Sequence, residues 1–393
     1  MSVLTQDQLA QGQHGLKAHS DTLVPVQTRS ERFASTDPTA FPEVTGREIE
    51  WKLSPVPLLR PLIDGELDGT RYDVGGAEGS AATIEWIARD DARIGRAGTP
   101  EDRASANAWS AFGEALAITV GTEEQTDVVL TRSGFGTGAR AAHTVITATP
   151  NSRGLVILGS TGPARLAENV EIVVQDGAHL TVVSLQEWDD DAVHTATHFA
   201  TVGRDASLKH IVVSLGGAVV RVNPSVHLDG DGADGELYGL YFADAGQHIE
   251  QQVYLHHAAE HTRGRVNYKG ALQGDGARTV WIGDVLIGAD AVGTDSYEQN
   301  RNLVLTEGTR ADSIPNLEIE NGDILGAGHA SATGRFDDEQ LFYLQARGIS
   351  EAEARRLVVI GFLAEIVQKI GNAELEQRLH AAIERELAGG AAR

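Results

Sequence analysis

The middle of the chain repeats one short pattern, in which a turn rich in Asp, Gly and Ala introduces an apolar run. Turns of this kind begin at Asp176, Asp205, Asp231 and Asp275, and the first three recur about every 28 residues. A repeat of that length is a structural unit that buries its apolar face only by stacking on its neighbours. The pattern therefore favours a fold built from stacked units.

Strand-forming sequence dominates from about residue 126 to residue 319. The apolar runs are short, rich in Val and Ile, and broken by Gly, Asp and Asn, as in GLVILGS, VEIVVQ and LTVVSL. No long helical pattern interrupts them, which argues against a doubly wound α/β fold. A sandwich or a barrel would use similar strands, but the repeated turns favour a parallel β-helix. We predict a mainly β protein with a β-helix core.

Four regions are expected along the chain. Residues 1–36 form a flexible or loosely docked N-terminal segment, and residues 37–125 form an α-rich region. Within the α-rich region, Pro and acidic residues favour a helix that starts near Glu101 and runs to about Ala117. The β-helix core occupies residues 126–335, and a helical C-terminal region occupies residues 336–393.

Three helices are predicted in the C-terminal region. The first spans Asp337–Ala346 and ends before Gly348. The pattern Ser350–Glu353 is typical of a capping box that opens a second helix. Apolar residues cover much of the circumference of that second helix, so it is buried either within its own chain, which is the more common case, or against a partner. The third helix spans Ala373–Leu387.

Composition excludes several functions. A formal net charge of −24 repels a phosphate backbone or an anionic lipid surface, so neither nucleic acid nor membrane is an expected partner. The chain has no Cys, and it therefore has no disulfide, no thiolate nucleophile and no thiolate ligand of its own. Its start lacks the pattern of a signal peptide, and no segment has the apolar length of a membrane span, so we expect a cytoplasmic protein.

Two acidic or glycine-rich motifs lack the context that their chemistry requires. Gly230–Gly235 has the spacing GxGxxG, but strand-like sequence follows it instead of the helix that would hold a pyrophosphate. The same turn carries Asp229, Asp231 and Asp234, but Ala233 occupies a position that a calcium loop needs for a ligand. A solvated β-turn is the better interpretation of both.

A local cluster of His256, His257, Glu260 and His261 suggests a metal site. In a strand, His257 and His261 would lie on one face about 13 Å apart, too far for one ion unless a turn intervenes. A hydrogen-bonded surface role is the stronger hypothesis for these histidines.

The segment Pro315–Gly334 presents a single imidazole, His329, among residues too small to fill a core. An apolar strand precedes it and a charged helix follows it. From the residues alone, a turn-stabilising histidine is favoured over a metal ligand.

Three phrases carry a resemblance to a known family. The segments Val266–Asp295, Asn300–Ile324 and Gly328–Phe362 together resemble the SufB/SufD family of iron–sulfur cluster assembly proteins. The resemblance implies a right-handed parallel β-helix flanked by helical regions. Because SufB is the cysteine-bearing scaffold of the family, a chain without cysteine looks like the SufD branch. The implied partners are SufB, in a heterodimer, and the ATPase SufC.

The same resemblance points to a ligand. Where family members commonly carry K-C-S-H-G-A-T-V-G, alignment on His329 and Gly334 places the family cysteine on Ala327. His329 then remains as the candidate ligand of iron or a nascent cluster, alongside SufB thiolates at the interface between the two subunits. The isolated chain is expected to bind no cofactor, and the iron or cluster would be held transiently.

The resemblance also implies a docking region for SufC on the helices between Asp337 and about Lys369. Its candidate contact residues are Leu341, Phe342, Tyr343 and Phe362.

The leading hypothesis is a non-catalytic subunit of an assembly complex, with ATP hydrolysis on SufC. One alternative is a carbohydrate-active β-helix enzyme that uses paired carboxylates such as Asp229 and Asp231. Another is a homodimeric scaffold that carries iron without SufB, and a homodimer of the isolated chain is compatible with the leading hypothesis as well.

Overall fold

The computed structural model describes residues 32–76, 80–335 and 338–390. The described helices and strands lie in one compact unit, Ala34–Arg393. Most of the N-terminal segment expected to be flexible, residues 1–36, lies outside the described residues.

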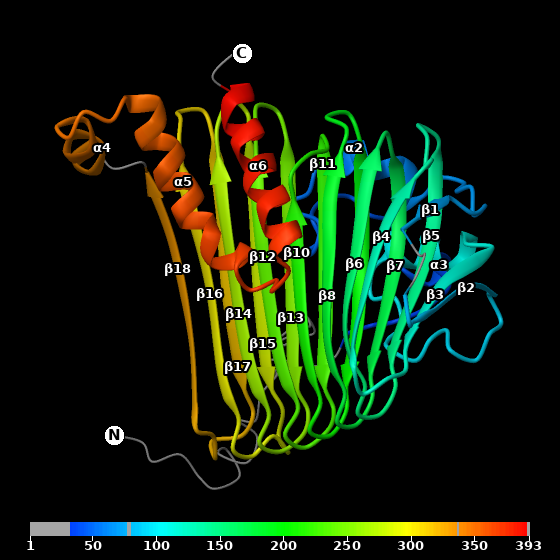
Figure 1. Ribbon diagram of the computed structural model, residues 1–393. Coiled ribbons are helices and arrows are strands. Elements are labelled where there is room, and N and C mark those ends of the chain that lie inside the picture. Colours follow the sequence, from blue (N-terminus) through cyan, green and yellow to red (C-terminus); the bar gives the residue numbers. More distant parts are fainter. Residues whose placement is uncertain (1–31, 77–79, 336–337, 391–393) are drawn as a thin grey trace, which may run out of the picture. The chain divides into compact units, whose positions relative to one another are not determined.

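Two sheets of nine strands each form the centre of this unit (Figure 1). In spatial order, the first sheet contains β1 (Asp73–Gly75), β4 (Gln125–Ser133), β6 (Arg153–Gly162), β8 (His179–Trp188), β10 (Ser207–Ser214), β12 (Asp234–Ala243), β14 (Arg263–Leu272), β16 (Asp295–Val304) and β18 (Gly326–Arg335). The second contains β17 (Arg310–Ile319), β15 (Arg278–Ile287), β13 (His248–His257), β11 (Val219–Leu228), β9 (Val193–Val202), β7 (Arg165–Val174), β5 (Ala139–Ala148), β3 (Glu114–Val120) and β2 (Thr83–Ala88). We call them the β18 sheet and the β17 sheet.

From β3 onwards the chain alternates between the two sheets, and from β5 onwards each strand pairs in parallel with the strand two places earlier. Two strands make one turn, and the stack has about eight turns. Only the β1–β4 and β2–β3 pairings are antiparallel among the described strands. The predicted fold, a mainly β protein with a β-helix core and helices towards both ends, is confirmed.

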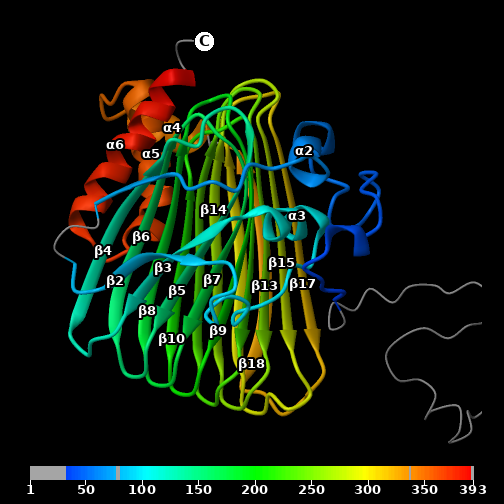
Figure 2. The ribbon, with the colours of Figure 1, turned by 90° about the vertical axis from the view of Figure 1, so that its right-hand side faces the viewer.

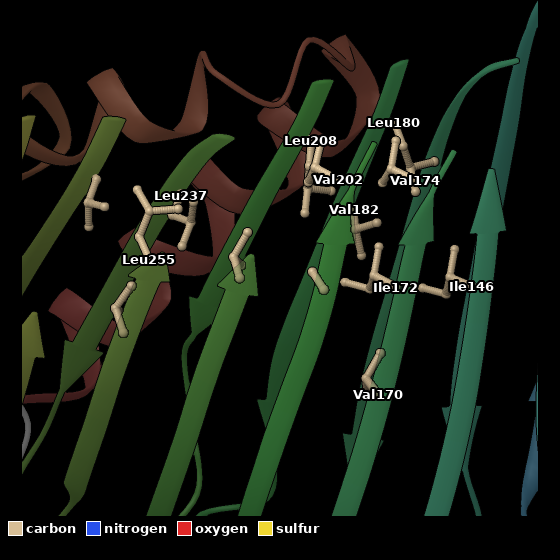
Figure 3. Packing of buried hydrophobic residues seen from close by; sticks show 14 of the residues in the cluster. Ile146, Val170, Ile172, Val174, Leu180, Val182, Val202, Leu208, Leu237 and Leu255 are labelled. Carbon is tan, nitrogen blue, oxygen red and sulfur yellow. The ribbon is translucent and has the colours of Figure 1, made fainter. Parts of the chain in front are cut away.

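The core lies between the two sheets because alternate residues of each strand point inward. Val170, Ile172 and Val174 of β7 share one buried cluster with Leu180 and Val182 of β8 (Figure 3). Burying each such side chain contributes about 1.5–3 kcal/mol, which offsets the entropy lost on ordering the chain. The small number of bulky residues in the sequence is thus distributed along one long, narrow core.

Helices cover the outer faces of both sheets, and Figure 2 shows them on opposite sides of the stack. The described helices are η1 (Pro38–Ala40), α2 (Val56–Ile63), α3 (Arg103–Ala111), α4 (Asp338–Gln345), α5 (Glu351–Val367) and α6 (Ala373–Gly390). The N-terminal helices α2 and α3 pack on the β17 sheet. The C-terminal helices α5 and α6 pack on the β18 sheet, against residues such as Ile211, Tyr238 and Leu240.

The signals at Ser350, Gly348 and Gly371 mark helix ends as predicted, whereas α6 runs to Gly390, beyond the Leu387 expected. The Ser350 side chain accepts a hydrogen bond from the Glu353 backbone N–H and so caps α5. Gly348 and Gly371 follow α4 and α5 with φ of 86° and 72°, a conformation that glycine adopts without the strain of a side chain.

The region 37–125 is less helical than expected. It contains η1, α2 and α3, but also β1, β2 and β3. The helix expected to run to Ala117 ends at Ala111, and Glu114–Val120 forms β3 instead. In β3, Leu116 and Ile118 point into the core while Ala117 packs under the N-terminal helices. Stacking on β5 supplies the partner that local propensity does not reveal.

Two tyrosines fill the core opposite glycines. In the paired strands β12 and β14, Gly239 lies beside Tyr268, and Tyr241 lies beside Gly270. A Cβ atom on Gly270 would lie 1.8 Å from Tyr241 Cε2, and one on Gly239 would lie 1.9 Å from Tyr268 Cδ1. Each glycine therefore provides the space in which the neighbouring ring lies flat.

We expect Gly270→Ala to destabilise the fold. The added methyl group must displace the Tyr241 ring, which is fully buried and donates a hydrogen bond to Asn302, so the free energy of unfolding should fall by roughly 1–3 kcal/mol. Urea unfolding measures the change, with Gly322→Ala as the control because a Cβ there meets nothing within 4 Å. Equal midpoints for the two variants would contradict the packing argument.

The interior also contains buried ionisable groups near its middle. Arg132 forms an ion pair with Glu168 at 2.6 Å, and His194 lies 2.9 Å from the same carboxylate. Beside them His198 Nδ1 lies 2.9 Å from His210 Nε2. Burial lowers the pKa of His210 to about 4 and holds the pKa of His198 well below its usual value.

This histidine pair predicts acid sensitivity. The pKa values of both histidines are lower in the folded chain than in the unfolded chain. Between pH 6.5 and about 4 the unfolded chain therefore binds more protons than the folded chain, and the free energy of unfolding falls as the pH falls. At pH 5 the loss is on the order of 2 kcal/mol for His210, and His198 adds a loss of the same sign. Thermal unfolding between pH 7 and pH 5 should show a shallower fall in Tm for His210→Gln than for the wild type, with His179→Gln as an exposed control. An unchanged slope in His210→Gln would refute the assignment.

Candidate functional site

The C-terminal end of the stack is open. β17 and β18 are the last strands of their sheets, and no described strand stacks beyond them. Most of their residues are at least partly exposed, whereas the strands in the middle of the stack are mostly buried. An edge of this kind presents backbone N–H and C=O groups that another chain can pair with.

His329 lies on β18 at this open end. It pairs in register with Glu298 of β16, so both side chains point towards the interior of the stack. The His329 side chain is 44% exposed, because its neighbours along the strand are small and no further turn covers it. His329 Nδ1 lies 3.6 Å from Glu298 Oε1, which is longer than a hydrogen bond.

Glu298 is a buried carboxyl group without the usual partners. Its side chain is fully buried, and neither oxygen accepts a hydrogen bond from the described residues. Burial raises its pKa to about 8, and the negative charge of Asp284 adds to the effect. Space for the carboxyl group comes from Gly283, where a Cβ would lie 2.3 Å from Glu298 Oε2.

The next inward residues of β16 are fully paired, in contrast to Glu298. Asn300 donates to Tyr241 Oη at 2.9 Å and to the Tyr268 carbonyl at 3.1 Å. Asn302 donates to Asn300 Oδ1 at 2.8 Å and accepts from Tyr241 Oη at 2.7 Å. The amides of Asn300 and Asn302 therefore find hydrogen-bond partners in the interior, whereas the carboxyl group of Glu298, two and four residues away, finds none among the described residues.

Further unpaired polar atoms lie near Glu298. The Trp281 ring approaches the same point beside Gly283, and Trp281 Nε1 has no hydrogen-bond partner among the described residues. Tyr268 Oη is likewise buried without a partner, and the Tyr268 and Trp281 rings are 6.2 Å apart. The end of the interior next to His329 is thus polar and incompletely satisfied.

An imidazole nitrogen and a carboxylate oxygen are ligands for a divalent metal ion. Two such ligands do not complete a coordination shell, and within the described residues no group of three or more His, Asp or Glu side chains is placed to hold a metal. Any ion bound here would need ligands beyond these two side chains.

The four residues expected to contact a partner differ in exposure. On α4, Phe342 is 73% exposed and Tyr343 is 55% exposed, whereas Leu341 is buried. Phe362 on α5 packs against the cluster under the C-terminal helices, and Lys269 Nζ lies 4.8 Å from the centre of its ring. Only Phe342 and Tyr343 present most of their side chains to solvent.

The His cluster of β13 is divided by the fold. His257 points inward, where its Nδ1 lies 2.8 Å from Thr262 Oγ1 and its Nε2 lies 3.0 Å from Ser296 Oγ. His256 points to the outer face, with its Nδ1 3.3 Å from His227 Nδ1. His261 lies in the turn after the strand with a φ of 56°. A single metal site containing all three histidines is not formed.

The turn between β11 and β12 has no helix after it. Gly230–Gly235 leads directly into β12, so the helix that a dinucleotide-binding motif requires does not follow it. Asp231 of this turn pairs with Arg204 Nη2 at 3.0 Å.

Glu298 was missed in the sequence. The strand DSYEQNRNLV has no apolar column, so its alternation alone cannot show which face is buried. Only its register with β14 and β18 places Glu298 inside. One signal in the sequence could have pointed to Glu298. It is a charged residue in a strand without apolar alternation, and it lies close in sequence to the motif of His329.

Comparison with known proteins agrees with this architecture. The family model described as "SUF system FeS cluster assembly, SufBD core domain" matches residues 130–362. An iron–sulfur cluster assembly SufBD family protein of Mycobacterium bovis is 49% identical over 371 residues, covering 91% of this chain and 93% of the relative. A protein of the same description from Mycobacterium leprae is 48% identical over 365 residues, covering 90% and 93%.

A more distant relative has a more specific name. The iron–sulfur cluster assembly protein SufD of Escherichia coli is 30% identical over 220 residues, which covers 56% of this chain and 52% of that protein. None of the described helices has the length and apolar character needed to cross a membrane.

Proposed function

Because the chain belongs to the SufBD family of iron–sulfur cluster assembly proteins, we propose that it is the SufD-like, non-catalytic subunit of a cytoplasmic complex with SufB and the ATPase SufC. The absence of cysteine supports this assignment, since a chain without thiolates holds a nascent cluster only together with a partner that has them. The similarity to a protein named SufD points the same way.

The open end of the stack carries the proposal. β17 and β18 leave both sheets unfinished at the same end, and His329 is half-exposed there. A SufB subunit that pairs with these edges covers His329 and brings its thiolates to the imidazole. A second copy of this chain is the competing occupant of the edge, but it brings nitrogen and oxygen ligands only.

Coupling to SufC is mechanical in this proposal. SufC binds the C-terminal helices, closes on nucleotide and shifts the helices against the stack, which opens or strains the interface at β17 and β18. Support comes from α5, which packs on the outer face of the β18 sheet and accepts a hydrogen bond from Lys269 Nζ at the Phe362 carbonyl, 3.0 Å away. Cluster loading that proceeds equally well without ATP would contradict this coupling.

The role of His329 is tested in the complex. We expect anaerobically co-purified SufB, SufC and His329→Ala chain to assemble like the wild type but to lose most of the iron and sulfide found after reconstitution. His179→Ala, at an exposed histidine of β8, serves as the control. Unchanged cluster content in His329→Ala would make this subunit architectural.

The docking of SufC is tested on α4. Phe342→Ala removes an exposed ring, so the Tm of the isolated chain should stay constant while SufC binding weakens by roughly tenfold, as for a truncated aromatic contact. Ile49→Ala, at an exposed apolar residue of the N-terminal region, should leave SufC binding unchanged. Calorimetric titration of SufC into each variant measures the difference, and equal affinities would place the docking surface elsewhere.

A further inference from the structure

The structure retains a group that weakens its own fold. A buried carboxyl group without a hydrogen-bond partner costs folding free energy, and native interiors contain few of them. Glu298 is fully buried, and neither of its oxygens accepts a hydrogen bond from the described residues. Groups that oppose stability in this way concentrate at functional sites.

The described residues around Glu298 leave space for its side chain but do not hydrogen-bond to it. Gly283 leaves the volume that the carboxyl group occupies, since any larger residue would place a Cβ 2.3 Å from Glu298 Oε2. Asn300 and Asn302, on the same inward column, are held by Tyr241 and by each other and do not turn towards the carboxyl group. The carboxyl group is therefore held in place, but it accepts no hydrogen bond from the part of the chain that the structure describes.

We propose that Glu298 and His329 together form a two-ligand site for ferrous iron at the open end of the stack. This inference rests on the proposed function and extends it by a ligand of this chain. It also assigns the chemistry of the two subunits: this chain contributes nitrogen and oxygen donors, which suit Fe(II), and the thiolates come from the partner.

The geometry fits a shared ion better than a direct contact. Two ligand atoms that each lie about 2.1 Å from one ion are roughly 3–3.6 Å apart. Glu298 Oε1 and His329 Nδ1 are 3.6 Å apart, at the upper end of that range and beyond a hydrogen bond. The two residues are paired across β16 and β18, so the ladder holds their separation without an ion present.

The two proposed ligands differ in their exposure to solvent. The carboxyl group is buried, while the imidazole is 44% exposed. An ion between them contacts this chain on its inner side and leaves its outer side free for ligands that the partner brings to β17 and β18. A site with only two ligands in one chain releases iron easily when the interface opens, which suits a transient cargo.

The test uses the anaerobic three-subunit complex without a sulfur source. Fe(II) affinity is measured by competition with a chelator for the wild type, Glu298→Gln, His329→Ala and Glu320→Gln. Glu320 is an exposed carboxylate just beyond β17 and serves as the matched control. Glutamine keeps the size of Glu298 and its ability to accept a hydrogen bond, but removes the anionic ligand, so it separates coordination from simple positioning of His329.

We expect Glu298→Gln to bind Fe(II) at least tenfold more weakly, with an equal or higher Tm, whereas Glu320→Gln binds like the wild type. A lowered Tm with unchanged Fe(II) affinity would assign Glu298 a structural role and overturn the inference. Wild-type affinity in Glu298→Gln together with lost affinity in His329→Ala would also overturn it, while leaving the proposed function intact. Wild-type affinity in both variants would reject the iron site and the role of His329 together.

Discussion

The constraint on which the structure depends is the in-register stacking of parallel strands. Each strand from β5 onwards lies on the strand two places earlier, so an inward-facing residue stays inward from one turn to the next. A shift of one residue would turn the whole strand over and expose its apolar column. Each sheet also has apolar residues on its outer face, and these need to be buried. Helices α2 and α3 bury them on the β17 sheet, and α5 and α6 bury them on the β18 sheet.

The same order explains how polar groups occur inside. A polar residue in the inward column lies between inward residues of the turns on either side, and it is tolerated where those neighbours provide partners. Arg132 and Glu168 pair across the two sheets, and the amides of β16 pair with Tyr241. Glu298 departs from this rule at the last fully stacked position before the open end, where a ligand from outside the chain can reach the interior.

Much of the architecture could be predicted from the sequence because its signals are local and repeated. The turn repeat indicates the stack, and Ser350, Gly348 and Gly371 mark the ends of the C-terminal helices. The pattern predicts a helix as far as Ala117 because the alanines suit one, but pairing with β2 and β5 makes Glu114–Val120 a strand. His329 is a candidate ligand because of a family resemblance and not because of its chemistry alone. Glu298 was not found, because its burial depends on the register of β16 between two other strands.

A stack in which each turn contacts only its neighbours has modular length. The parallel pairing is the same in every turn between β5 and β14, so a turn can be added or lost there wherever the covering helices and buried pairs such as Arg132 and Glu168 keep their partners. The final turn has no such freedom, because β16, β17 and β18 carry both the unfinished edges and the paired Glu298 and His329. The length of the stack can therefore change in evolution while the residues of its last turn stay the same.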